Sequence, residues 1–241
     1  MANALEIKEL KKEYGSKAAV NKISFDVEED SLFALLGVNG AGKTTTIKML
    51  TGLANPTSGD AMIFGHSIVN EKELVKTFVN LSPQETSIAP NLSVRENLEF
   101  IAGIYGMDKE KTARKTQEMI EMFSLQEVEK DKAKTLSGGW QRKVSIAMAL
   151  ITEPKLLFLD EPTLGLDVLA RRELWNVIEK LKKEVTIVLT THYMEEVEAL
   201  ADKIAIMVSG EVKAIGTLNE LIEQTGTKNL EEAFVSIAGK N

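Results

Sequence analysis

Cysteine is absent from this chain, which excludes disulfides, thiolate zinc sites, iron–sulfur clusters and a cysteine nucleophile. The 2 histidines leave almost nothing for a histidine-based metal centre, and the 5 prolines are too few for a long disordered or collagen-like chain. The longest apolar runs, residues 32–36 and 146–151, are far shorter than the roughly 20 residues that span a bilayer. We therefore expect no membrane span, and we expect any metal to be bound through oxygen.

Length and charge bound the architecture and the partners. At about 150 residues per domain, 241 residues make one large domain or two small ones, and 44% hydrophobic with 27% charged residues is an ordinary globular composition. The net charge of −7, without a long basic run, argues against nucleic acid as the main partner. The first ten residues lack the basic start and apolar block of a signal peptide, so we expect a cytoplasmic location.

Periodicity predicts an α/β protein interrupted by a helical block. The expected strands are residues 5–10, 23–27, 32–36, 61–64, 155–159 and 185–190, followed by a hairpin of 204–208 and 211–216. Helices are expected from Leu92 to Tyr105 with a Ser93/Glu96 capping box, over 109–123, from Trp140, between the last two strands, and after Leu218. The helices between residues 92 and 151 form the insertion.

A phosphate-binding loop follows the strand 31–36 and precedes a helical stretch, 45–50. Residues 37–44 fit the pattern G-x-x-x-x-G-K-[ST]. Glycines let successive backbone N–H groups face a phosphate, the lysine reaches the terminal phosphates, and the threonine supplies a hydroxyl to Mg²⁺. A ligand-free glycine turn would explain neither the lysine nor the threonine. The residues that we expect at the nucleotide here are Gly37, Asn39, Gly40, Ala41, Gly42, Lys43, Thr44 and Thr45.

The apolar strand 156–159 ends in two carboxylates, Asp160 and Glu161. Parallel strands direct their carboxyl ends to the ligand crevice, so Asp160 fits the role of holding Mg²⁺ and Glu161 that of orienting and deprotonating attacking water. Taken alone, solvated acids at a strand end are equally well supported. Together with the loop at 37–44, they predict a Mg²⁺-dependent nucleoside triphosphatase or kinase.

Residues 136–141, LSGGWQ, place Ser137, Gly138 and Gly139 at the start of an amphipathic helix, where amide donors suit an anion. From these residues alone, a simple N-cap turn is the better supported interpretation. The segment nevertheless resembles the signature of the ATP-binding cassette (ABC) ATPases, and it lies between the other two motifs as that family requires.

The resemblance covers nearly the whole chain. Tyr14 resembles the family's adenine-stacking aromatic, Gln84 its Q-loop glutamine, Asp167 its D-loop aspartate and His192 its switch histidine. Singly, each has an ordinary structural alternative, such as a strand-end aromatic or a helix cap. Two positions depart from the family pattern: Trp140 stands where glutamine is common, which should alter packing beside ATP, and Val38 is a milder change.

The resemblance implies a P-loop NTPase (RecA-like) core with an N-terminal antiparallel β subdomain and a helical insertion. It divides a single domain, 1–241, into a core of 1–83 and 152–241 and a helical subdomain of 84–151. It further implies ATP hydrolysis with Lys43, Gln84, Glu161 and His192 as catalytic residues. The implied cofactors are ATP and Mg²⁺, the metal being held by Thr44, Gln84 and Asp160.

The resemblance also implies partners. Two ATPase copies, identical or not, would pack head to tail so that ATP on Lys43 and Thr44 of one is closed by Ser137, Gly138 and Gly139 of the other. A separate transmembrane permease subunit would carry the cargo, which places this chain peripherally on the inner face of the cell membrane. The stretch from Thr190 to Thr217 and the short tail after it resemble the ATP-binding subunits of export-type transporters, including those for drugs, sodium or surface polymers. The alternatives are a soluble ABC ATPase acting on nucleic acid or ribosomes, and a P-loop small-molecule kinase.

Overall fold

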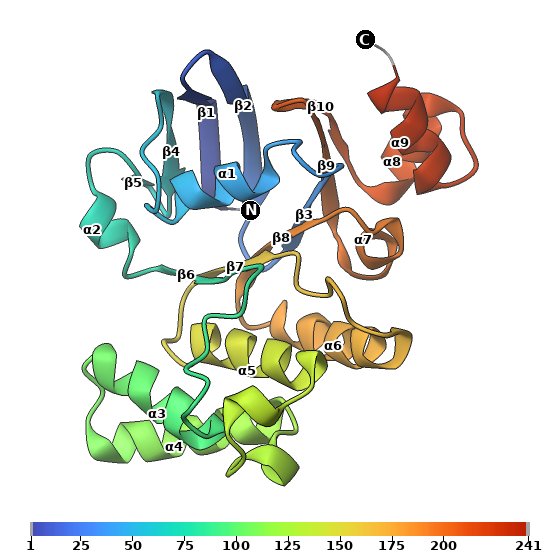
Figure 1. Ribbon diagram of the computed structural model, residues 1–241. Coiled ribbons are helices and arrows are strands. Elements are labelled where there is room, and N and C mark those ends of the chain that lie inside the picture. The colour runs from blue at the N-terminus through green and yellow to red at the C-terminus, as the bar shows by residue number, and fades with distance from the viewer. Residues whose placement is uncertain (1, 240–241) are drawn as a thin grey trace.

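Two β-sheets of different construction form the framework of the protein, whose computed structural model describes residues 2–239. One sheet has four strands in the order β2-β1-β4-β5, and the other has six in the order β10-β9-β3-β8-β7-β6 (Figure 1). The strands are β1 (Asn3–Tyr14), β2 (Lys17–Glu28), β3 (Leu32–Leu36), β4 (Ser58–Ile63), β5 (His66–Ser67), β6 (Val79–Ser82), β7 (Leu156–Asp160), β8 (Thr186–Thr191), β9 (Lys203–Val208) and β10 (Glu211–Gly216).

The six-stranded sheet is parallel from β9 to β6, with β10 antiparallel at its edge. Every residue of β3, β7 and β8 is buried, as expected for parallel strands covered on both faces. The helix α1 (Lys43–Leu50) lies between the two sheets, whereas α5 (Gly138–Leu150) and α6 (Val168–Leu181) cover the opposite face (Figure 1). Phe25 of β2 stacks on Phe33 of β3 with ring centroids 5.0 Å apart, which joins the cores of the two sheets.

A helical block separates β6 from β7 in the chain. It contains α3 (Val94–Ile104), α4 (Lys109–Met122) and α5, with short 3-10 turns at Gln126–Val128 and Ala133–Thr135. The predicted capping box is confirmed: Ser93 accepts from the backbone of Glu96, and Glu96 accepts from that of Ser93. The apolar faces of these helices share one core with α6 and with the face of the six-stranded sheet that α5 and α6 cover.

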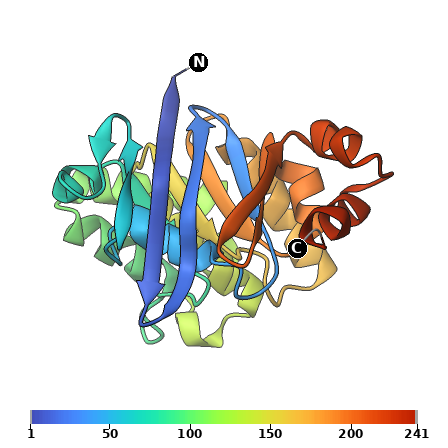
Figure 2. The same cartoon turned by 90° about the horizontal axis from the view of Figure 1, so that it is seen from above.

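The C-terminal part packs at one end of the molecule (Figure 2). The predicted hairpin is confirmed as β9 and β10, and β9 also pairs in parallel with β3, so the hairpin extends the central sheet. The helices α7 (Met194–Leu200), α8 (Leu218–Thr225) and α9 (Leu230–Ala238) pack beside it, and α2 (Lys72–Val75) is a single turn before β6. None of the helices within residues 2–239 is both long enough and apolar enough to span a membrane.

Candidate functional site

A cleft of about 780 Å³ lies between the two sheets, in the size range of about 300–1,000 Å³ that is typical of small-molecule sites. One wall is the loop between β3 and α1, and the other is the start of β2. The lining residues are Tyr14, Lys17, Ala18, Ala19, Asn39, Gly40, Ala41, Gly42, Lys43, Thr44, Thr45, Gln84, Glu161, Leu164, His192, Ser209 and Gly210. The cleft therefore gathers groups from segments far apart in the chain.

Gly42 is the residue on which the loop geometry depends most. It is the N-cap of α1, and its φ of 108° is one that residues with a Cβ rarely adopt. A Cβ at this position would lie 2.5 Å from the backbone oxygen of Ala19 and 2.7 Å from Cε of Met207. The close contact with β2 therefore requires glycine here.

We expect Gly42→Ala to lower the free energy of unfolding by more than Gly40→Ala does. Both positions have positive φ, which costs about 1–3 kcal/mol for a residue with a side chain, but a Cβ on Gly40 meets nothing within 4 Å. The difference between the two variants in the free energy of unfolding, measured by urea denaturation, reports the contacts with Ala19 and Met207. Equal unfolding free energies would contradict this account of the loop.

Lys43, Glu161 and His192 form a chain of contacts at the base of the cleft. Nζ of Lys43 lies 3.0 Å from Oε1 of Glu161 and donates to the carbonyl of Gly37 at 2.8 Å. The other carboxylate oxygen, Oε2, lies 2.8 Å from Nδ1 of His192. The side chains of Lys43 and Glu161 are 5% and 6% exposed, so this ion pair is buried, whereas His192 reaches the cleft surface.

The backbone at Glu161 is held in a strained conformation. Its φ is 49°, in the left-handed region, and its N–H donates both to the carbonyl and to the hydroxyl of Thr190 on β8. Positive φ in a residue with a Cβ persists where surrounding contacts enforce it, and such residues concentrate at functional sites. Here the end of β8 holds the carboxylate over Lys43.

Asp160 lies directly behind the loop. Its Oδ1 accepts from the hydroxyl of Thr44 at 3.1 Å and from that of Thr190 at 2.5 Å, and its side chain is almost fully buried. Mg²⁺ is bound in proteins by one or two carboxylates together with oxygen from hydroxyls, phosphates and water. Thr44 and Gln84 line the cleft, and Asp160 contacts Thr44 from behind the loop. The oxygen atoms of these three side chains fit that ion.

An aromatic ring supports His192. The centroids of His192 and Tyr193 are 4.1 Å apart, and the guanidinium carbon of Arg171 on α6 lies 4.8 Å from the centroid of Tyr193. Deeper between α6 and α7, Nε1 of Trp175 donates to the fully buried carboxyl of Glu196, whose pKa is raised by burial. Tyr193 and Arg171 thus connect the imidazole to α6, the helix that Asp167 caps.

The other predicted residues divide into two groups. Tyr14 and Gln84 line the cleft, and Tyr14 is 55% exposed at its mouth. Ser137, Gly138, Gly139 and Asp167 do not line it. Ser137 is the N-cap of α5, and Asp167 is the N-cap of α6, where Oδ1 accepts from the N–H groups of Leu169 and Ala170. The structure thus shows the capping roles of both residues and leaves the ends of both helices outside this chain's own cleft.

Trp140 packs away from the exposed start of α5. It is partly buried against the core of the helical block, and Nζ of Lys143 lies 4.7 Å from its ring centroid. Lys143 also pairs with Glu173 of α6 at 2.9 Å. Trp140 therefore packs against the lysine that links α5 to α6. Gly138 remains open, because a Cβ there would meet nothing within 4 Å.

Sequence reasoning missed several residues of the site. Thr190 bonds to both Asp160 and Glu161, yet a threonine in an apolar strand belongs to no motif. Lys17 follows the predicted Tyr14 closely, and Ser209 and Gly210 were predicted only as a hairpin turn; all three line the cleft. The dipeptide at 209–210 carried a turn signal but no signal for a ligand.

Comparison with protein-family models matches residues 20–164 to the family described as ABC transporter. The chain is 39% identical to the linearmycin resistance ATP-binding protein LnrL of Bacillus subtilis (strain 168), over 96% of this chain and 75% of that protein. It is 36% identical to the probable multidrug ABC transporter ATP-binding protein YbhF of Escherichia coli (strain K12), over 97% of this chain and 41% of that protein. It is 42% identical to the human phospholipid-transporting ATPase ABCA3, of which it spans 13%.

Solved structures agree on the fold. A structure described as the ATP binding subunit of an ABC transporter is 32% identical with a TM-score of 0.86, covering 97% of this chain and 99% of that chain. The ADP conformation of MJ1267, described as an ATP-binding cassette of an ABC transporter, has a TM-score of 0.85 at 24% identity, covering 98% and 99%. At that identity the second likeness concerns the fold alone. The predicted α/β core, antiparallel sheet and helical insertion are confirmed.

Proposed function

The chain is an ATPase that belongs to the ABC transporter family, and from this membership we propose that it drives transport through a separate membrane subunit by closing head to tail on ATP with a second ATPase copy. The observation that carries the proposal is the convergence of Lys43, Glu161 and His192 at the base of one cleft. A lysine, a carboxylate and an imidazole at a phosphate loop supply the charge stabilisation and the base that phosphoryl transfer requires.

We propose that phosphate oxygens replace the present partners of Lys43. Its ammonium now donates to the carbonyls of Gly37 and Val38 and pairs with Glu161, and ionised phosphate is a stronger acceptor than a carbonyl. Turning Lys43 toward the phosphates frees one oxygen of Glu161 to accept a proton from attacking water. His192 then holds the other oxygen and faces the transferred phosphate, while Tyr14 stacks on adenine.

Thr44, Asp160 and Gln84 would hold Mg²⁺, which neutralises phosphate charge when it is bound. Of these, Asp160 is the sole ionised ligand. The hydroxyl of Thr190 on the same carboxylate oxygen orients it toward Thr44.

A second ATPase copy completes the site in this proposal. The cleft exposes Tyr14 and the loop at 37–44, whereas the amide donors at Ser137, Gly138 and Gly139 point from another surface of the same chain. A head-to-tail partner brings its Ser137 segment over the phosphates and its Asp167 beside them. Two identical copies satisfy this geometry, as do two related ones.

The membrane subunit would dock on the helical block. Phe100 and Ile104 of α3 and Tyr105, its C-cap, are 54%, 61% and 54% exposed and form an apolar surface on this block. We therefore place the protein peripherally on the inner face of the membrane. The similarity to LnrL, a linearmycin resistance ATP-binding protein, and to YbhF, a probable multidrug ABC transporter ATP-binding protein, favours export. In the same proposal, residues 1–83 and 152–241 form the nucleotide-binding core and residues 84–151 form a helical subdomain.

Purification of the tagged chain from detergent extracts tests the partnership. We expect a protein with several membrane-spanning segments to co-purify and to raise ATP hydrolysis. The double variant Phe100→Ser, Ile104→Ser should lose that partner, whereas Val235→Ser, which alters an apolar residue 64% exposed on α9, should keep it. Recovery with ribosomes or nucleic acid instead would contradict the proposal and favour a soluble ABC ATPase.

A further inference from the structure

Gln84 enters the cleft from a segment without regular structure, between β6 and α3. Its backbone is held from α5. Nη1 of Arg142 donates to the carbonyl of Pro83 at 2.6 Å, and Nη2 of the same guanidinium donates to the carbonyl of Gln84. One planar side chain thus binds two consecutive carbonyls, 59 and 58 residues away in the sequence.

Arg142 is an unusual residue to bury. It is 5% exposed, and no carboxylate of the described residues 2–239 lies within ion-pair distance of it. Burial lowers the pKa of the guanidinium, while the more distant carboxylates of Asp160 and Glu196 favour its charged form. Burying a charge is costly unless it is hydrogen-bonded. The charge-assisted hydrogen bonds from Arg142 to the carbonyls of Pro83 and Gln84 therefore offset the desolvation of its guanidinium.

The position of Arg142 on α5 connects this contact to the other half of the site. It lies one turn after Gly138, in the N-terminal part of α5, the helix that Ser137 caps. One turn further, Oγ of Ser145 lies 3.0 Å from Oγ of Ser82, the residue at the end of β6. The N-terminal half of α5 and the segment that carries Gln84 are therefore bonded along one side.

We propose that Arg142 is a positioning residue that fixes Gln84 to the helix bearing Ser137, so that Gln84 reaches the metal and phosphates only when that helix is docked. The role in hydrolysis rests on the function proposed above. Arg142 itself touches neither the phosphate loop nor the cleft.

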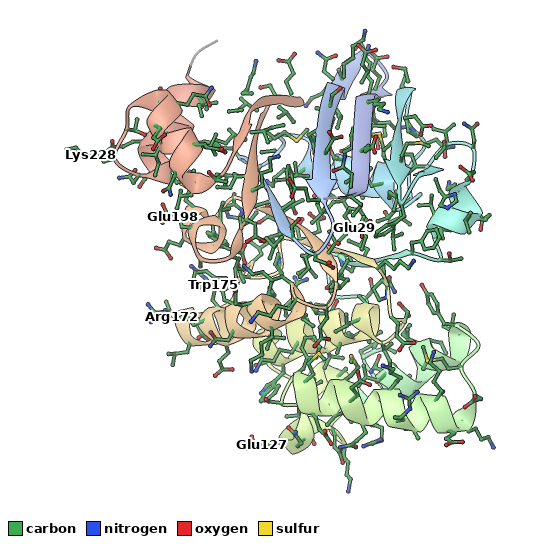
Figure 3. All side chains as sticks on the ribbon, turned by 180° about the vertical axis from the view of Figure 1, so that it is seen from behind. Glu29, Glu127, Arg172, Trp175, Glu198 and Lys228 are labelled. Carbon is green, nitrogen blue, oxygen red and sulfur yellow. The ribbon has the colours of Figure 1, made fainter. Side chains whose placement is uncertain are left out.

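The test uses Arg142→Met, which keeps the length of the stem but removes every donor, with Arg142→Lys as the conservative variant and Arg172→Met as the control. Arg172 extends from the outer surface of α6 and is exposed (Figure 3). Amide hydrogen exchange of residues 84–88 is measured first, without nucleotide. We expect faster exchange in Arg142→Met alone, and unchanged exchange would overturn the inference whether or not the protein hydrolyses ATP.

The kinetic measurement addresses the consequence. For Arg142→Met we expect ATP hydrolysis to fall about 10- to 100-fold and the Mg²⁺ concentration for half-maximal rate to rise, with ATP affinity unchanged. Arg142→Lys should recover part of the rate. Added to Gln84→Ala, Arg142→Met should cost little more. A lowered melting temperature with unchanged Mg²⁺ dependence, or additive losses in the double variant, would overturn the positioning role while leaving the ATPase assignment intact.

Discussion

Glu161→Gln is expected to bind ATP but to hydrolyse it about 10²- to 10⁴-fold more slowly, the range attributed to a positioned general base. An amide preserves the shape of the carboxylate beside Lys43 and His192 but cannot accept the proton of attacking water. The measurement is phosphate release with saturating ATP and Mg²⁺. The control is Glu198→Gln, an exposed carboxylate on α7.

The same variant should accumulate the ATP-closed pair. Because the natural chain has no cysteine, Val38→Cys and Thr135→Cys can be introduced as the sole thiols, one within the phosphate loop and one two residues before Ser137. In Glu161→Gln, a short bismaleimide should join two chains through these positions when ATP is present, and either cysteine alone should give far less product. A wild-type rate of phosphate release would rule out Glu161 as the general base. A lack of ATP-dependent cross-linking would rule out the head-to-tail arrangement.

Lys43→Ala is expected to weaken ATP binding by about 100-fold or more, since hydrogen bonds to a charged group contribute about 1.5–3 kcal/mol each and Lys43 can donate to more than one phosphate oxygen. It should also destabilise the fold, because Glu161 would remain buried without its cationic partner, a loss of about 3–5 kcal/mol for a buried pair. Calorimetric titration with ATP and chemical denaturation measure the two effects separately.

The double variant Lys43→Ala, Glu161→Gln distinguishes lost binding from lost folding. With the uncompensated carboxylate removed, stability should return toward that of the natural protein, but ATP affinity should not. Restored ATP affinity in the double variant would show that Lys43 acts through the fold, not through the phosphates.

Features determined by neighbouring residues could be predicted from the sequence. The glycine loop lies between β3 and α1 as expected, and the Ser93/Glu96 capping box forms because both partners are within one turn. The single helical tail predicted after Leu218 is instead two helices. Gly226 ends α8 in the left-handed conformation and Asn229 caps α9, a pair of signals that could have revealed the break.

Features that depend on sheet order could not be predicted. β8 lies between β3 and β7, although it follows both in the chain, and this order brings Thr190 within hydrogen-bond distance of Asp160 and Glu161. No spacing in the sequence encodes it. Arg142 is similarly hidden, because an arginine on an amphipathic helix resembles a solvated charge until its helix is packed against the segment at Pro83.

The exposed start of α5 has a further consequence under the proposed arrangement. A single chain has one incomplete ATP site and one set of amide donors without a ligand, and a two-fold dimer uses both surfaces of both chains at once. In such a dimer, one ATP site cannot close while the other stays open. Binding of the first ATP would therefore favour binding of the second, and the two nucleotides would act together in each transport cycle.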